Sequence, residues 1–308
     1  MNKVYIQSPA SVSNLGSGFD VMGFALHEPF DSMELSLIDQ PTITISQKKE
    51  FGISNDPAQN VAGRVLMVIR ERTGMKQGFE LMIDKKIKPG SGIGSSAASA
   101  AGAAVAANVL LGNIFSKNEL VQLAMEGEVI ASGSRHADNV APCIFGGITL
   151  IRSLDPIDII SIPSVDLFVT ILHPQIEIKT SYARSILRKE VPMHDAIKQW
   201  GNLGALVAGF FMKDARLIGR SMEDVIAEPY RKALIPGYDE AKSIAFSAGA
   251  IGGCISGSGP SIFMFSETRE TANDVAKAMN EVYIRLGIPH HSYVTTINCD
   301  GVKVVNSE

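Results

Sequence analysis

A short glycine-rich segment that runs directly into an alanine-rich stretch constrains this 308-residue chain most strongly. The segment is Lys88-Pro-Gly-Ser-Gly-Ile-Gly-Ser-Ser-Ala-Ala98, and small residues continue to about Leu111. Glycines at 90, 92 and 94 let backbone amides approach a ligand without interference from a Cβ atom. A helix beginning there adds its free amides and the positive end of its dipole, which suits a polyphosphate. The pattern favours a phosphate-binding loop over its alternative, a tight turn with a serine N-cap.

Neither of the two common nucleotide-binding patterns fits this loop. The loop lacks the Gly-Lys-Ser/Thr of a Walker A motif, and its third glycine, Gly94, comes too early for Gly-x-Gly-x-x-Gly. Two serines follow where a hydroxyl can cap the helix, contact a phosphate or ligate Mg²⁺. The nucleotide-binding residues that we predict are Lys88, Pro89, Gly90, Ser91, Gly92, Ile93, Gly94, Ser95, Ser96, Ala97 and Ala98.

Composition excludes several classes of function. A formal net charge of −4 without long basic runs gives no electrostatic footprint for binding nucleic acid. Three cysteines without Cys-x-x-Cys spacing argue against a disulfide framework or a thiolate metal site. The N-terminus lacks the apolar core of a signal peptide, and the longest apolar stretch, around 97–111, is too short to span a bilayer. We therefore expect a cytoplasmic protein that binds neither nucleic acid nor a membrane.

The spacing of apolar residues predicts an α+β chain rather than a doubly wound sheet. Alternating segments predict strands over 4–7, 31–38, 42–46, 79–83, 148–151, 166–172, 252–256, 261–265 and 293–297. Helical spacing predicts helices over 59–73, 95–111, 116–130, 180–187, 196–211, 238–248 and 270–286, with a capping box at Ser116 and Glu119. Because strands and helices do not alternate regularly, we expect two domains, 1–160 and 161–308, with a proline-containing seam around 155–163.

Three polar segments in the first half are candidate sites. The loop predicted over 8–20 carries Asn14 and Asp20, and a turn with Asx hydrogen bonds explains it equally well. Glu128, near the end of a helix, could complete the coordination of a nucleotide-bound Mg²⁺; its alternative is an exposed helix carboxylate. Residues 133–139 crowd charged side chains before a buried strand, as a site or a solvated turn would.

The second half offers two arginines and a glycine turn. Thr180 is expected to cap a helix whose first turn carries Arg184, and Arg231 follows Glu-Pro-Tyr. A guanidinium presents a planar fork that matches a carboxylate, although either arginine could equally lie on the surface. Gly257-Ser-Gly-Pro260 between two apolar segments predicts a hairpin turn, which could also close over a phosphate or a substrate.

These segments, in this order, resemble the GHMP kinase superfamily, which includes galactokinases and mevalonate kinases. The glycine loop is similar to its ATP signature, Pro-x-x-x-Gly-Leu-Gly-Ser-Ser-Ala, and Gly-Ser-Gly-Pro is similar to its third motif. Ser-Asn-Leu-Gly-Ser-Gly-Phe-Asp20, Ser-Arg-His-Ala-Asp-Asn-Val-Ala-Pro142 and Glu-Pro-Tyr-Arg231 resemble the homoserine kinase branch. The resemblance extends over about residues 3–300.

The resemblance implies a ribosomal-S5-like N-terminal domain, a ferredoxin-like C-terminal domain and, since members are often dimeric, a homodimer. It implies transfer of the γ-phosphoryl group of ATP to the hydroxyl of L-homoserine in threonine biosynthesis. Mg²⁺ would be held by Ser96 and Glu128, adenine would contact Asn60, and Asp138 or Asn139 would lie beside the acceptor hydroxyl. The implied substrate-binding residues are Asn14, Asp20, Arg135, His136, Thr180, Arg184, Arg231, Gly257, Ser258 and Gly259.

The chemistry of homoserine agrees with these roles. A zwitterion with a primary hydroxyl needs an anion for its ammonium group, which Asp20 supplies, and cations for its carboxylate, which Arg184 and Arg231 supply. Thr180 and His136 would orient the rest of the molecule. Three alternatives stay open: a kinase for mevalonate or another small alcohol, a decarboxylase of the diphosphomevalonate type, and a non-catalytic nucleotide or sugar sensor.

Overall fold

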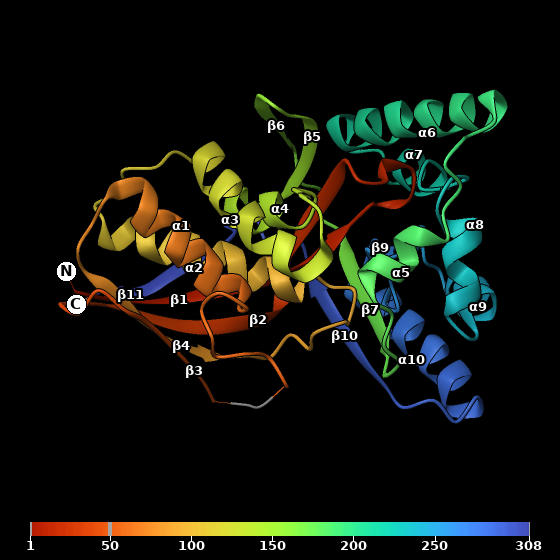
Figure 1. Ribbon diagram of the computed structural model, residues 1–308. Helices are drawn as coiled ribbons and strands as arrows, with labels where there is room; N and C mark the ends of the chain where they lie inside the picture. Colours follow the sequence, from red (N-terminus) through yellow and green to blue (C-terminus); the bar gives the residue numbers. More distant parts are fainter. Residues whose placement is uncertain (1, 49–50, 308) are drawn as a thin grey trace.

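The computed structural model describes residues 2–48 and 51–307 and contains two sheets (Figure 1). Long strands β1 (Lys3–Ser13) and β2 (Met22–Ile38) pair antiparallel at the centre of the first sheet, whose order is β11-β1-β2-β4-β3. The hairpin of β5 and β6 extends this sheet from β2. The remaining strands are β3 (Ile43–Gln47), β4 (Gly78–Asp84), β5 (Ile148–Leu154), β6 (Ile157–Ile162) and β11 (Lys303–Ser307).

A layer of helices packs with the first sheet around one apolar core. The layer contains α1 (Val61–Thr73), α2 (Ser95–Leu110), α3 (Lys117–Ser132) and α4 (Val140–Phe145). The alanines of α2 are buried almost all round, because α2 contacts α1, α3 and β1 at once. A Cβ on Gly102 would lie 2.4 Å from the sulfur of Met33, so the small residues permit this close approach. The capping box at Ser116 and Glu119 is confirmed.

The second sheet is antiparallel, with the order β10-β7-β9-β8. Its two faces enter different cores, because successive side chains of a strand alternate. In β9, Phe263 and Phe265 face the first sheet, whereas Ile262 and Met264 face the layer of α9 and α10. The elements are β7 (Phe168–Pro174), β8 (Gly252–Ile255), β9 (Ile262–Ser266), β10 (His290–Thr296), α9 (Tyr238–Ser247) and α10 (Arg269–Arg285).

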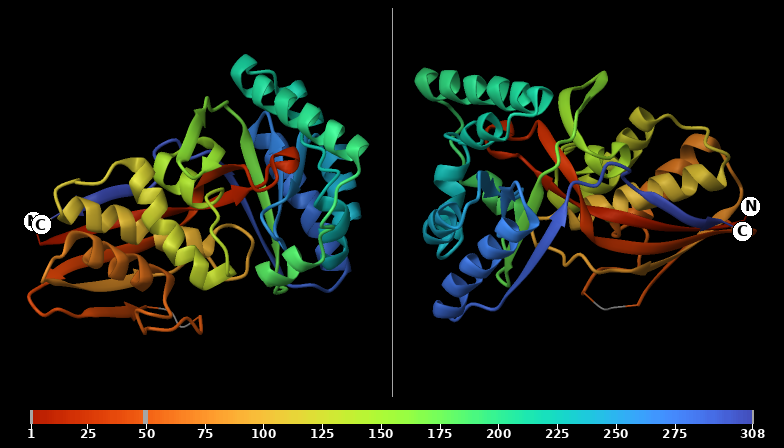
Figure 2. Two further views of the ribbon diagram at one scale, coloured as in Figure 1. Left: turned by 45° about the horizontal axis from the view of Figure 1, so that its top comes forward. Right: turned by 180° about the vertical axis from the view of Figure 1, so that it is seen from behind.

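One apolar core joins the two halves of the chain. Phe24 of β2 packs against Phe263 and Phe265, with ring centroids 5.6 and 5.4 Å apart. Figure 2 shows the layer of α1, α2 and α3 at one end of the molecule, and α6 beside the second sheet at the other. The remaining elements are η1 (Gly16–Gly18), α5 (Thr180–Ser185), α6 (Met193–Met212), α7 (Ala215–Arg220), α8 (Glu228–Arg231) and η2 (Lys232–Leu234).

Three expectations about local structure are corrected. The loop expected over 8–20 is shorter, because residues 8–13 continue β1 and pair with β2. The strand β6 occupies most of the expected seam and pairs with β5. Thr180 is not an N-cap: Lys179 precedes α5, and no side chain caps that helix.

The boundary near residue 160 stays a proposal. We propose that it follows the change of sheet between β6 and β7, with β11 returned to the first sheet beside β1. Within the described ranges, no helix combines the length and the apolar character needed to cross a bilayer.

Candidate active site

A cavity of about 470 Å³ lies where elements from both halves of the chain meet. This volume is typical of sites for small molecules and nucleotides. Its walls come from the end of β1, the glycine loop, the first turns of α2, the segment before α4, and α5 and α8. The cavity thus brings together most of the segments that the sequence singled out.

The glycine loop requires its glycines. Gly90, Gly92 and Gly94 have φ of 72°, 81° and 68°, a region that favours glycine. A Cβ on Gly92 would lie 2.6 Å from the carbonyl oxygen of Gly259, and one on Gly94 would lie 2.1 Å from Oγ of Ser11. Because α2 begins at Ser95, directly after Gly94, its first amides lie at the cavity wall.

The predicted hairpin turn supports this loop. The turn joins antiparallel strands β8 and β9, which confirms the hairpin. Oγ of Ser256 donates to the carbonyl oxygen of Gly92 at 2.7 Å, and Oγ of Ser261 donates to that of Ser91 at 2.6 Å. The turn between β8 and β9 therefore holds the backbone of the glycine loop in place through two hydrogen bonds.

A buried ion pair closes the base of the loop. Nζ of Lys85 donates to Asp31 at 2.6 Å, to the carbonyl oxygen of Ser95 at 3.0 Å and to Oγ of Ser99 at 2.9 Å. The other carboxylate oxygen of Asp31 accepts the amides of residues 86 and 87. Lys85 and Asp31 are 2% and 0% exposed, so their charges depend on these partners. The pair ties the start of the loop to the first turn of α2.

A serine and a glutamate face each other beside this turn. Oγ of Ser96 donates to Glu128 at 3.2 Å, and both residues line the cavity. Burial raises the pKa of Glu128 to about 7; the hydrogen bond from Ser96 opposes the shift, and nearby Asp138 adds to it. Glu128 is 6% exposed, so its alternative as an exposed helix carboxylate is wrong.

Asp138 and Asn139 both line the cavity but differ in their hydrogen bonds and in their ability to ionise. Oδ1 of Asn139 accepts from Ser11 and its Nδ2 donates to Ser13, each at 2.9 Å, so β1 holds this amide on both sides. Burial raises the pKa of Asp138 to about 6, with a further contribution from Asp20. Asp138 is therefore the one of the two that can exchange a proton near neutral pH.

Charged groups from both halves of the chain line another part of the cavity wall. Both guanidinium Nη atoms of Arg184 donate to the carboxylate of Asp20, at 2.9 and 2.7 Å. Nη1 of Arg231 donates to the carbonyl oxygen of Gly257 at 2.9 Å. Burial and these two arginines lower the pKa of His136, which favours a neutral imidazole near neutral pH.

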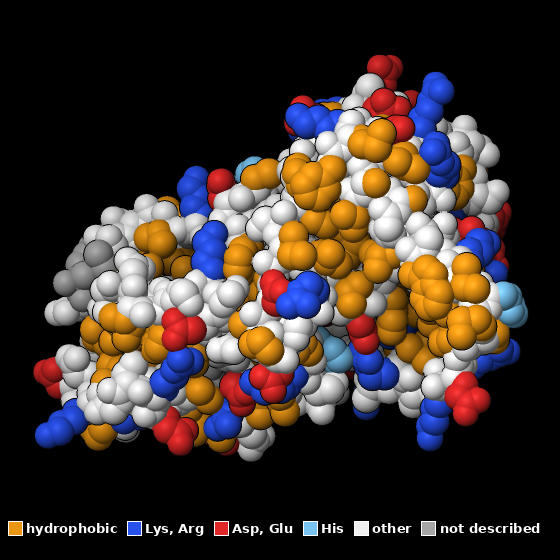
Figure 3. All heavy atoms as spheres, turned by 90° about the horizontal axis from the view of Figure 1, so that it is seen from above, with side chains coloured by type: hydrophobic (Ala, Val, Ile, Leu, Met, Phe, Trp, Pro, Cys, Tyr) orange, Lys and Arg blue, Asp and Glu red, His pale blue; other side chains and the backbone are white. Residues whose placement is uncertain are grey.

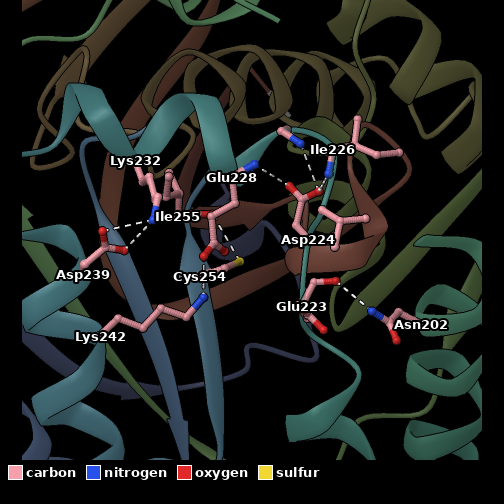
Figure 4. Close-up of polar contacts among 12 residues, drawn as sticks. Asn202, Glu223, Asp224, Ile226, Glu228, Lys232, Asp239, Lys242, Cys254 and Ile255 are labelled. Atoms are coloured by element: carbon pink, nitrogen blue, oxygen red, sulfur yellow. Dashed lines mark hydrogen bonds and ion pairs between the residues drawn. The ribbon is translucent and has the colours of Figure 1, made fainter. Parts of the chain in front are cut away.

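The position of Arg231 depends on a carboxylate that sequence reasoning missed. Asp224 accepts the amides of residues 226, 227 and 228 at 2.8–3.0 Å, and so orients the start of α8 (Figure 4). Gln199 of α6 donates to Asp224 at 3.0 Å and to the carbonyl oxygen of Ser17 at 3.1 Å, and accepts the amide of Val225. One buried amide thus joins the turn that carries Asp20 to the helix that carries Arg231.

Some predicted residues lie outside the cavity wall. Arg135 is largely exposed and pairs with Glu126. The amide of Asn60 lines the cavity, but its Oδ1 caps α1 and its Nδ2 donates to Ser54, so an adenine contact stays a prediction. The predicted residues absent from the wall are Lys88, Ser91, Ile93, Ala97, Ala98, Arg135 and Gly259.

Other wall residues were not anticipated. The wall includes Ser13, Lys85, Ser99, Glu177, Ile178 and Lys179. Of these, Lys85 had a usable signal: a lysine between an alternating strand and a glycine loop.

Both halves of the chain match one family. The GHMP kinases N terminal domain matches residues 60–147, and the GHMP kinases C terminal domain matches residues 196–285. The chain therefore belongs to the GHMP kinases, a family of ATP-dependent kinases that act on an alcohol group. A mevalonate kinase structure, 15% identical with a TM-score of 0.72 over 96% of this chain and 99% of that one, shares the fold.

Within that family the chain belongs with the homoserine kinases. The homoserine kinase of Chlorobaculum tepidum is 44% identical over 313 residues, which cover 97% of each protein. That of Chloroherpeton thalassium is 47% identical over 296 residues, 92% of this chain and 93% of the relative. A crystal structure of homoserine kinase from Cytophaga hutchinsonii superposes with a TM-score of 0.95 at 44% identity, covering 99% of this chain and 98% of that one.

Proposed function

We propose that this enzyme transfers the γ-phosphoryl group of ATP to the hydroxyl of L-homoserine, giving O-phospho-L-homoserine and ADP. The observation that carries the proposal is the charge pattern of the cavity. One part of the wall has a glycine loop at a helix N-terminus, and another part has a carboxylate with two guanidinium groups. A polyphosphate fits the first part and an α-amino acid fits the second.

Ser96 and Glu128 suit a nucleotide-bound Mg²⁺ better than a fully protein-bound ion. Mg²⁺ in kinases takes one or two protein ligands and completes its coordination with phosphates and water. Among the residues that the structure describes, no group of three or more His, Cys, Asp or Glu side chains could form a protein cage. The hydroxyl of Ser96, in the first turn of α2, and the carboxylate of Glu128, near the end of α3, would hold the ion, which neutralises phosphate charge when bound.

The residues of the chain would act mainly by position and charge. Phosphoryl transfer has a loose transition state, so stabilisation of the γ-oxygens and alignment of the hydroxyl dominate the rate. We propose that the amides at the start of α2 bind the phosphates. Asp138 takes the hydroxyl proton as the new O–P bond forms and the bond to ADP breaks. Asn139, fixed by Ser11 and Ser13, is then a positioning residue.

Acceptor selectivity tests the proposal directly. ADP release would be measured with MgATP and L-homoserine, mevalonate, galactose or no acceptor. We expect turnover only with L-homoserine. Nucleotide binding without turnover on any acceptor would favour the sensor hypothesis, and release of carbon dioxide from a phosphorylated acid would favour the decarboxylase.

The requirement for Mg²⁺ should depend on pH through Glu128. Its raised pKa of about 7 means that the carboxyl group is protonated below this pH, and a ligand carboxylate must be deprotonated. Half-saturating Mg²⁺ should therefore rise by roughly tenfold per pH unit below about 7, and stay constant above it. Titrations from pH 5.5 to 8.5 measure this dependence. Glu126→Gln on the same helix is the matched control and should keep the wild-type profile; a flat profile for the wild type would contradict the assignment.

Substitution of Gln199 should raise KM for homoserine and leave KM for ATP nearly unchanged. Gln199→Leu removes the hydrogen bonds to Ser17, Asp224 and Val225, so the turn that carries Asp20 and the helix that carries Arg231 lose their common support. We expect KM for homoserine to rise by about tenfold, the effect of losing roughly 1.4 kcal/mol of hydrogen bonding. KM for ATP should change by less than about twofold, because the glycine loop does not contact Gln199.

Asn202→Leu provides the control for this prediction. Asn202 lies one turn further along α6 and donates a single hydrogen bond to the carbonyl oxygen of Glu223, without a bond to Ser17. This variant should keep both KM values. Equal changes in the KM values for homoserine and ATP in Gln199→Leu would indicate a general loss of structure instead.

We also propose a homodimer, as the family resemblance implies. Hydrophobic side chains gather on the face seen in Figure 3, and Met193, Ile197 and Trp200 of α6 are 69%, 53% and 56% exposed. Light scattering during size-exclusion chromatography would give the mass. A monomeric mass at the enzyme's working concentration would contradict the proposal.

A further inference from the structure

The side chains assigned to the ammonium group and to the carboxylate of the substrate are bonded to each other. Nη1 and Nη2 of Arg184 donate to the two different carboxylate oxygens of Asp20, at 2.9 and 2.7 Å. This fork-to-carboxylate geometry occupies both oxygens at once. Asp20 comes from the turn after β1 and Arg184 from α5, so the ion pair bridges two walls of the cavity.

This ion pair is open to a ligand. The side chains of Arg184 and Asp20 are 37% and 32% exposed, and both line the cavity. Nε of Arg184 is buried and makes no hydrogen bond with any residue in the ranges 2–48 and 51–307. Arg231 differs, because its Nη1 and Nε donate to the carbonyl oxygens of Gly257 and Ala183. Arg184 is therefore the cation that can change its partner.

We infer that an α-amino acid enters by exchange with this ion pair. The ammonium group takes the place of Arg184 at Asp20, and the carboxylate takes the place of Asp20 at Arg184. The inference rests on the proposed function, since homoserine carries both charges on one carbon atom. One ion pair becomes two, and no charge is left without a counter-ion.

A consequence for specificity follows from this exchange. An alcohol with only a carboxylate breaks the same ion pair but leaves Asp20 without a cation beneath the bound ligand. An alcohol with only an ammonium group leaves Arg184 without an anion. A charge that a bound ligand covers and leaves unpaired lowers the affinity for that ligand. Singly charged alcohols are therefore disfavoured both by this unpaired charge and by the contacts that they lack.

Two fragments of homoserine test the exchange. One is 4-hydroxybutanoate, which lacks the ammonium group, and the other is 3-aminopropan-1-ol, which lacks the carboxylate. Their affinities would be measured by titration calorimetry in the presence of MgADP, so that the result does not depend on turnover. The proteins are the wild type, Asp20→Asn and Arg184→Met, with Arg188→Met as the control: Arg188 lies over the ring of Tyr230, outside the ion pair.

The expected result is a crossed pattern. Asp20→Asn should bind 4-hydroxybutanoate about fivefold more tightly than the wild type, the upper value for a half-exposed ion pair. Arg184→Met should bind 3-aminopropan-1-ol more tightly by a similar factor. Both variants should bind L-homoserine at least about tenfold more weakly, and Arg188→Met should match the wild type throughout. Thermal unfolding would verify that all three variants are folded.

The outcomes separate the exchange from the proposed function. If the wild type phosphorylates L-homoserine but neither variant gains affinity for its matching fragment, the exchange is wrong and the proposed function stands. If the crossed pattern is found but L-homoserine is not phosphorylated, the exchange stands and the proposed acceptor is wrong.

Discussion

Replacing Asp138 by asparagine is expected to lower kcat for L-homoserine by roughly 10²–10⁴-fold, the usual loss of a general base. The substitution keeps the size and polarity of the side chain and removes its ability to take the hydroxyl proton. Burial raises the pKa of Asp138 to about 6, with Asp20 contributing, so the carboxylate is mostly ionised at neutral pH and can still accept a proton efficiently. Single-turnover measurements of ADP formation would report the chemical step itself.

The pH profile provides a second readout of the same role. A base must be deprotonated to act, so at saturating Mg²⁺ kcat of the wild type should fall as pH falls through about 6 and reach a plateau above it. This acidic limb should be absent from the residual activity of Asp138→Asn. A loss of only a few-fold, with the limb retained, would reject the base and leave positioning and electrostatic stabilisation as the source of the rate.

The elements that the sequence predicted well are those whose signal is local. The capping box at Ser116 and Glu119 and the glycines before α2 need only their neighbours in the chain. The α+β class followed from the irregular order of such segments, and the family motifs carried the domain type. A helix was predicted over 95–111, directly after the glycines, and α2 confirms it.

Elements whose partners are distant were missed. Residues 8–13 have no apolar alternation, because the hydroxyls of Ser8 and Ser11 bond to Ala98 and Asn139, about 90 and 128 positions away. Gln199 and Ser17 are 182 positions apart, and only the packed fold brings them together. Long-range hydrogen bonds leave no periodic pattern in a sequence, so reasoning from spacing cannot find them.

The candidate site shows the same division. Asp20 and Arg184 were both identified from their motifs, yet their bond to each other depends on the fold. Lys85 lies between a predicted strand and the glycine loop, but nothing in the spacing indicates its partner Asp31, which is 54 positions away. Ser32 of β2 pairs with Asp84 of β4, and this register places the neighbouring residues Asp31 and Lys85 side by side. A shift of one residue would turn one of them to the other face of the sheet.

The buried ion pair of Lys85 and Asp31 leads to the largest expected effect on stability. Lys85→Met leaves the carboxylate of Asp31 buried without its cation and should lower the free energy of unfolding by about 3–5 kcal/mol. The start of α2 also loses the bond from Nζ to the carbonyl oxygen of Ser95, so the glycine loop is no longer held at both ends. KM for ATP should therefore rise by at least about tenfold. Urea denaturation and initial rates would measure the two effects.

Two further variants separate stability from nucleotide binding. Lys86→Met removes the adjacent, half-exposed lysine, which pairs with Asp84 at the surface, and should change stability by less than about 0.5 kcal/mol. Asp31→Asn combined with Lys85→Met removes both buried charges, so it should recover most of the lost stability, because a buried pair replaced as a unit leaves no charge unpaired. The double variant still lacks the bond to Ser95, and its KM for ATP should stay high. Recovery of both stability and KM would show that the pair supports the fold alone and has no part in holding the ATP loop.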